Sequence, residues 1–314
     1  MITLTMHAPA KLNLSLAVSP EITGGKHLLR SVFTTISLAD QLIFEYQPDL
    51  PTALSIDMQF NNDVDKIPIP LHKNIIYQAI RAFEARFGYE LAGKLHVSVT
   101  KNIPTQAGLG GGSSDAAATL KAMVKLSGIE LDIAGFGNEL GSVAAELGAD
   151  VAFFLEGGCA LMGGHGEQLL HQLHLLELDI VLVKPNTGLS TALVYKEFSR
   201  NPAPATTLDE MVELLQSAKP SSDQQSRCQQ SDSSVTPQVV AKLLANNLTP
   251  AATSLMPEIA EITEQLEAQP GILKALLAGS GSTVFAVVAN PQAANTAATN
   301  FQAKGYWTQV CKTV

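Results

Sequence analysis

A glycine-rich segment constrains this chain more than any other feature of its sequence. It reads "QAGLGGGSSDAAATL" over residues 106–120, and four of the seven residues from Gly108 to Ser114 are glycine. The alternating segment "KLHVSVTKNIP" before it is typical of a strand, and the alanine-rich run after it is typical of a helix. The sequence therefore predicts a strand, a turn almost without side chains, and a helix N-terminus.

A turn of this kind is suited to binding an anion. The first amides of a helix have no acceptor within the helix, and the helix dipole places partial positive charge there. Glycines let the backbone approach a phosphate closely, so that successive N–H groups surround its oxygens. Ser113 and Ser114 would either cap the helix or add hydroxyl donors. The alternative is a flexible turn with an ordinary serine cap, but the position between strand and helix favours phosphate binding.

The segment does not match the commonest phosphate-binding loops. No lysine follows the glycines as a Walker loop requires, and the third glycine of a dinucleotide fingerprint starting at Gly108 is replaced by Ser113. The H-R-D and D-F-G signatures of protein kinases are also missing from the sequence.

Composition limits the classes of partner. The chain of 314 residues is 46% hydrophobic and only 16% charged, with a formal net charge of -9. This balance argues against nucleic-acid and membrane partners, because both need a basic face, and it leaves a small phosphorylated ligand open. Three distant cysteines and no signal peptide or long apolar run lead us to expect a cytoplasmic protein.

The pattern of the remaining segments predicts an α+β protein. Residues 74–88 have helical periodicity ending at a glycine, and residues 27–46 alternate as strands broken at Ala39-Asp40. "LKALLAGSGSTVFAVVA" passes from a helix or strand through a small-residue turn into a strand. Residues 217–237 are rich in Ser, Gln, Pro and Asp, which is typical of a mobile surface insertion.

Three segments together resemble the signature motifs of the GHMP kinase superfamily of small-molecule kinases. They are "APAKLNLSL" at residues 8–16, "PTQAGLGGGSSDAAA", and "LAGSGSTVFAV" at residues 277–287. Within that superfamily the chain is most similar to the 4-diphosphocytidyl-2-C-methyl-D-erythritol kinases. The elements "PAKLNL", "GKHLL", "GLGGGSS", "LGADV" and "GSG" follow in that family's order and cover most of the chain.

The resemblance implies a two-domain GHMP kinase architecture. An ATP-binding N-terminal domain of ribosomal-protein-type fold would span residues 1–160, and a ferredoxin-like C-terminal domain residues 161–314. The active site would lie in the cleft between them. The resemblance also implies ATP and Mg²⁺ as cofactors and a cytidine-diphospho-methylerythritol substrate, phosphorylated on its 2-hydroxyl. The metal ligands and the oligomeric state are left open.

The resemblance assigns catalytic roles to two residues that alone would suggest little. Asp150 precedes an apolar run, where an aspartate is usually a helix N-cap, and Lys11 lies in an alternating strand, where a lysine usually faces solvent. By resemblance Asp150 is the general base and Lys11 lies beside it. Asn13 shares the strand face of Lys11 and would contact substrate or close the strand network.

Further positions are assigned by resemblance alone. Those expected to bind ATP are Pro104, Gly108, Leu109, Gly110, Gly111, Gly112, Ser113, Ser114 and Asn74. Those expected to bind substrate are Asn13, His27, Gly279, Ser280 and Gly281. The other interpretations are a helix cap for Asn74, a structural role for His27 and a tight turn for residues 279–281. Asp115 is either a first-turn helix acid or a Mg²⁺ ligand, and Phe153 and Phe154 are expected in the core.

One departure from the family bears on the substrate. The family commonly has tyrosine before its histidine, where the ring stacks on cytidine, but here Lys26 precedes His27. Tyr195 is the candidate for a replacement ring. The alternatives are therefore a kinase of the same fold acting on another alcohol, of the mevalonate type or a sugar, and a nucleotide-binding relative without turnover.

Overall fold

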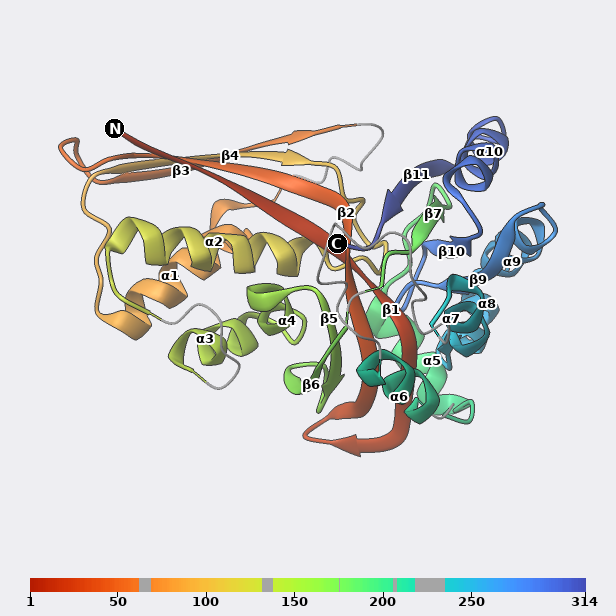
Figure 1. Ribbon diagram of the computed structural model, residues 1–314. Coiled ribbons are helices and arrows are strands. Elements are labelled where there is room, and N and C mark those ends of the chain that lie inside the picture. The colour runs from red at the N-terminus through yellow and green to blue at the C-terminus, as the bar shows by residue number, and fades with distance from the viewer. Residues whose placement is uncertain (62–68, 132–137, 175, 206–207, 218–234) are drawn as a thin grey trace.

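The computed structural model describes the chain except for residues 62–68, 132–137, 175, 206–207 and 218–234. Two β-sheets form its framework (Figure 1). The first sheet has seven strands, most of which come from the first half of the chain. Its strands are β1 (Ile2–Thr23), β2 (Lys26–Gln47), β3 (Ala53–Phe60), β4 (Lys94–Lys101), β5 (Cys159–Gly163), β6 (Gln168–Leu173) and β8 (Ala245–Asn246).

The sheet is built around the long β1–β2 pair. Its order is β3-β4-β2-β1-β8, and β5 pairs with both β2 and β6. All pairs are antiparallel except β3 with β4 and β1 with β8. Because β5 begins at Cys159 and pairs with β2, the first sheet extends past residue 160. The domain division at that residue stays a prediction.

The predicted strand break at Ala39-Asp40 is wrong, because β2 runs through it. A register shift lies there instead: Pro9 pairs with Ala39, whereas the next residue, Ala10, pairs with Ile36. Figure 1 shows β1 and β2 bending together beyond the end of the first helical layer. The bend carries the middle of β1 toward the second half of the molecule.

Four helices cover one face of the first sheet (Figure 1). They are α1 (Ile75–Phe87), which follows the 3-10 turn η1 (Leu71–Lys73), α2 (Gly111–Ser127), α3 (Glu139–Leu147) and α4 (Val151–Glu156). Their apolar faces meet the sheet in one core. The predicted helix ends at Gly88 and Gly128 are confirmed, since both glycines are left-handed caps with φ of 59° and 68°.

The second sheet has the predicted ferredoxin-like arrangement. Its strands are β7 (Asp179–Lys184), β9 (Ile272–Leu277), β10 (Val284–Val288) and β11 (Trp307–Lys312), in the antiparallel order β11-β7-β10-β9. The segment before the small-residue turn, left open between helix and strand, is therefore a strand, β9.

Helices lie on both sides of the second sheet. One core contains residues of α5 (Thr191–Arg200), α8 (Thr249–Leu255), α9 (Glu258–Glu267) and α10 (Pro291–Gln302). The other contains α6 (Asp209–Ser217), α7 (Pro237–Leu243) and the bent part of β1 and β2. This second core joins the two sheets and fixes the strand that carries Lys11 and Asn13 against the C-terminal half.

The two ends of the predicted insertion at residues 217–237 belong to helices. Ser217 ends α6, and Thr236 caps α7 by accepting a hydrogen bond from the amide of Val239 at 3.3 Å. Residues 218–234 lie outside the described part of the chain. Within the described part, no helix combines the length and apolar character needed to cross a bilayer.

Candidate active site

A cavity of about 1030 Å³ lies where the two halves of the molecule meet. The first half contributes β1, the start of α1 and the glycine loop between β4 and α2. The second half contributes the start of α5 and the turn between β9 and β10. Most of the predicted site residues line this cavity, namely Lys11, Asn13, His27, Asn74, Pro104, Gly108, Leu109, Gly110, Gly111, Gly112, Ser113, Asp150, Gly279 and Ser280.

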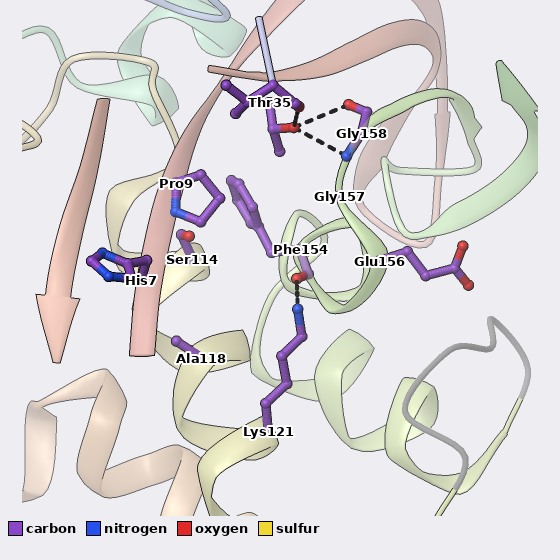
Figure 2. A pocket seen from close by; sticks show the side chains of 11 residues that line it. His7, Pro9, Thr35, Ser114, Ala118, Lys121, Phe154, Glu156, Gly157 and Gly158 are labelled. Atoms are coloured by element: carbon purple, nitrogen blue, oxygen red, sulfur yellow. Dashed lines mark hydrogen bonds between the residues drawn. The ribbon is translucent and has the colours of Figure 1, made fainter. Parts of the chain in front are cut away.

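The glycine loop has the conformation that only glycine readily adopts. Gly108 and Gly110 have φ of 75° and 74°, and α2 begins at Gly111 with Gly110 as its N-cap. The predicted serine cap is therefore wrong. Ser113 lines the large cavity, but the hydroxyl of Ser114 is buried toward a second, smaller cavity (Figure 2).

The loop is also in direct contact with the C-terminal half. A Cβ at Gly108 would lie 2.0 Å from the carbonyl oxygen of Ala278, so only a glycine fits there. The amide of Ser282 donates to the carbonyl of Gln106 at 3.2 Å. Ser280 Oγ lies 2.8 Å from Thr191 Oγ1, which joins the turn to α5. Of the predicted turn, Gly279 and Ser280 face the cavity, and Gly281 does not line it.

Lys11 and Asp150 meet at the floor of this cavity. Lys11 Nζ lies 3.3 Å from Asp150 Oδ2, and the side chains are 7% and 29% exposed. Asp150 occupies the N-cap position of α4, but its side chain caps no amide. The default interpretations of both residues therefore fail: the lysine is buried, and the carboxylate is turned toward it rather than toward the helix.

Asn13 fixes the position of the Lys11 ammonium. Lys11 Nζ donates to Asn13 Oδ1 at 2.8 Å, and Asn13 Nδ2 donates to Ser31 Oγ at 2.8 Å. Ser31 Oγ in turn donates to the carbonyl of Ser15 at 2.7 Å. The ammonium also lies 4.5 Å from the centre of the Phe33 ring, a favourable cation–π distance. The backbone amide of Lys11 donates to Leu109 O at 3.0 Å, which attaches the glycine loop to β1.

A buried charge cluster that sequence reasoning missed lies under the same loop. Lys101 Nζ donates to Asp40 Oδ2 and to Asp115 Oδ2, and all three residues are at most 5% exposed. Asp40 Oδ1 also accepts from the amides of Asn102 and Ile103, at 2.6 and 2.9 Å. Lys101 ends β4 and Asp115 lies in α2, so the cluster holds both ends of the loop together.

Asp115 is not the first-turn helix acid that was one of its two interpretations, because α2 begins at Gly111 and has no acid in its first turn. Burial is the largest influence on the Asp115 carboxyl group and raises the pKa from 3.8 to about 7. The positive charge of Lys101 is the next largest influence and acts in the opposite direction. Asp40 contributes to the rise as a second negative charge. Asp115 Oδ1 has no hydrogen-bond partner. The alternating strand ending in a lysine just before the loop was the one available signal for this cluster.

The predicted substrate side of the cavity contains His27, Lys26 and Tyr195. His27 is buried, and its two ring nitrogens lie 2.7 Å from Ser19 O and from Ser199 Oγ. Its ring centre is 5.9 Å from that of Tyr195. Burial first, and then Asp150, raise the pKa of Tyr195 to about 12. His165, which the sequence did not indicate, also lines this side and places Nδ1 3.0 Å from His27 O.

Two further predictions receive a mixed outcome. Asn74 is the N-cap of α1, since its Oδ1 accepts from the amide of Ile76 at 2.9 Å, and it also lines the cavity. Its contact with adenine stays a prediction. Phe153 and Phe154 are buried in the first core, as expected.

The site shows no ready-made metal centre. Among the described residues, no group of three or more His, Cys, Asp or Glu side chains is placed to hold a metal ion. Of the residues described, Asp115 and Asp150 are the carboxylates that line the cavity, and they come from different helix starts.

Comparison with known proteins agrees with this geometry. The family described as GHMP kinases N terminal domain matches residues 74–158, and GHMP kinases C terminal matches residues 237–306. A 4-diphosphocytidyl-2-C-methyl-D-erythritol kinase of Desulfitobacterium hafniense (strain Y51) is 35% identical over 309 residues, which cover 98% of this chain and 95% of that protein. The chain belongs to the GHMP kinases.

Solved structures place this GHMP kinase within its family. A crystal structure of 4-(cytidine 5'-diphospho)-2C-methyl-D-erythritol kinase has a TM-score of 0.74 and 30% identity, with 99% of each chain covered. A homoserine kinase from Cytophaga hutchinsonii has a TM-score of 0.69 at 17% identity, covering 99% of this chain and 94% of that one, and shares the fold. The chain is therefore an ATP-dependent small-molecule kinase, with the predicted two-part architecture.

Proposed function

We propose that this kinase transfers the γ-phosphoryl group of ATP to the 2-hydroxyl of 4-diphosphocytidyl-2-C-methyl-D-erythritol. The main observation behind this proposal is the Lys11–Asp150 pair, in which Nζ lies 3.3 Å from Oδ2. The pair lines a cavity to which the glycine loop and the C-terminal half both contribute. The similarity of 30–35% to kinases named for this substrate supports the choice of acceptor.

In this proposal Asp150 is the general base. Its carboxylate accepts the proton of the acceptor hydroxyl as the new oxygen–phosphorus bond forms. Lys11 lies beside that carboxylate and stabilises the negative charge that develops on the oxygen. The Asn13–Ser31 chain keeps the ammonium in place, so that little reorganisation is needed during the reaction.

The glycine loop supplies the phosphate site of the proposal. The first amides of α2, which carry no serine cap, and the backbone of Gly108 to Gly112 face the cavity and would bind the phosphate oxygens. Mg²⁺ would enter with ATP, neutralising charge between the phosphates, because it retains several waters and needs few protein ligands. The two distinct carboxylates at the cavity are compatible with that role, and we assign no ligand to the ion.

The cytidine side rests on the ring cluster around His27. Both ring nitrogens of His27 already contact protein atoms. Of the residues described on this side of the cavity, Tyr195 therefore supplies the ring on which the cytosine base would stack. Cytoplasmic location is part of the same proposal, supported by the free, buried thiols of Cys159 and Cys311.

One observation favours a second candidate acceptor. Lys26, exposed at the rim, stands where relatives commonly carry a stacking tyrosine, and a different alcohol would not need that ring. Purified protein incubated with ATP, Mg²⁺ and a panel of alcohols separates the two. We expect ADP and a phosphorylated product with the cytidine substrate. Turnover of mevalonate-type alcohols or sugars, without turnover of the cytidine substrate, would replace the proposal with the second candidate.

A further inference from the structure

A second cavity of about 310 Å³ lies behind the glycine loop (Figure 2). Its walls come from β1 and β2, from the α2 face that carries Ser114, Ala118 and Lys121, and from the end of α4 with Gly157 and Gly158. No residue lines both this cavity and the larger one. Its volume is at the small end of the range for ligand sites.

One buried polar group in this cavity lacks a hydrogen-bond partner, and a partly buried lysine that lines it has one. Ser114 is 1% exposed, and its hydroxyl has no hydrogen-bond partner. The Lys121 ammonium makes one hydrogen bond, to the carbonyl of Phe154 at 2.9 Å, and forms no ion pair with any residue the structure describes. Figure 2 shows Glu156, the nearest acid drawn, extending away from it. A buried hydroxyl without a partner, like that of Ser114, is uncommon in native proteins and calls for a ligand, an ion or water.

The two groups line the same wall of the cavity. Ser114 and Lys121 are seven residues apart on α2, which places them on the same helix face, with the small Ala118 between them. Burial, and then the nearby Lys125, lower the pKa of the Lys121 amine, and the charge of Glu156 opposes them to a smaller extent. Both influences would be offset by a bound negative charge.

The cavity is also linked physically to the phosphate loop. A Cβ at Gly110 would lie 2.9 Å from Phe154 Cζ, so the Phe154 ring that lines this cavity packs directly on the loop. The amide of Ser114 donates to the carbonyl of the same glycine at 2.9 Å. A ligand touching Ser114 and Phe154 therefore touches two neighbours of Gly110.

We propose that this second cavity binds a compact oxyanion, a phosphate or carboxylate group, through the Lys121 ammonium and the Ser114 hydroxyl, and that the bound anion weakens ATP binding. The anion would add negative charge behind the same helix start that receives the ATP phosphates. Coupling of this kind is reciprocal, so ATP would also weaken binding of the anion.

Inorganic phosphate is the probe that tests this, with acetate as the second arm, at an ionic strength held constant with NaCl. ATP affinity of the full chain is measured by calorimetry as either anion is raised. We expect the dissociation constant of ATP to rise about threefold or more and then level off, because a separate site saturates. Saturation with phosphate alone or with acetate alone would identify which group the site prefers.

The matched variants separate this site from simple competition at the glycine loop. Lys121→Met should lose the saturating effect, Lys121→Arg should retain it, and Lys125→Met, which removes an exposed charge from the same helix, should behave like wild type. Lys121→Gln replaces the methionine variant if that one does not fold. An anion effect that is missing, that rises without limit, or that is unchanged in the folded Lys121 variants would overturn the proposal.

Discussion

Lys101→Met is expected to cost more stability than any surface lysine change, and the loss should depend on pH. Lys101 is the one cation between Asp40 and Asp115, and all three are buried. Breaking a buried ion pair by removing one partner costs roughly 3–5 kcal/mol, because an uncompensated charge remains. Asp115, with its pKa already about 7, relieves part of that cost by taking a proton at low pH.

The direction of this pH dependence follows from the linkage between proton binding and folding. Without the ammonium, the pKa of Asp115 rises further, so the variant keeps its proton to higher pH, and ionising it then destabilises the fold. Urea denaturation at pH 5.5 and pH 8.0 measures both losses. We expect about 3–5 kcal/mol at pH 8.0 and a smaller loss at pH 5.5. Lys94→Met, on the exposed start of the same strand, is the control. A loss below about 1 kcal/mol at pH 8.0, or one equal to the control, would refute the reasoning.

Three other predictions, with four substitutions, test neighbouring parts of the site. The wild-type protein should lose stability as the pH rises from about 4 to about 7, because Asp115 keeps its proton to higher pH in the folded state than in the unfolded chain. Denaturation curves of Asp115→Asn should show a weaker dependence of stability on pH. An unaltered dependence would contradict the raised pKa of Asp115. Gly110→Val should abolish ATP binding in calorimetry, because a side chain there meets Phe154 at a positive φ and forces the loop out of its conformation; circular dichroism checks that the variant is folded, and unchanged affinity in the folded variant would rule out the phosphate cradle. Lys26→Tyr should lower and Tyr195→Ala raise KM for the cytidine substrate, each about tenfold, and no change in either would remove base stacking from the account.

The sequence predicted those parts of the molecule in which local pattern and tertiary structure agree. The strand, glycine loop and helix around Gly110 follow from alternation, positive φ and helix periodicity, and all three were confirmed. The catalytic pair was reachable only through family resemblance. Lys11 and Asp150 are 139 positions apart, and each taken alone fits a more ordinary role.

What the sequence could not show depends on side chains that meet across distant elements. Asp40 was predicted to mark a strand break, yet β2 continues through it, and its buried carboxylate accepts hydrogen bonds from the amides of Asn102 and Ile103. Ser113 and Ser114 fit a serine cap, but the loop places Gly110 at that position because Phe154 packs where a side chain would be. Such outcomes are decided by packing between strands and helices, which a one-dimensional pattern does not record.

The turnover number of Asp150→Asn, measured beside its ATP affinity, tests the central claim most directly. With cytidine substrate and Mg²⁺–ATP saturating, we expect kcat to fall by a factor on the order of 10² to 10⁴, because the proton acceptor is lost. The dissociation constant of ATP should stay within about twofold, since the backbone of the glycine loop is unchanged and Asp150 caps no helix amide. Near-normal kcat in this variant, with substrate and ATP bound as in wild type, would contradict the assignment of Asp150 as the base.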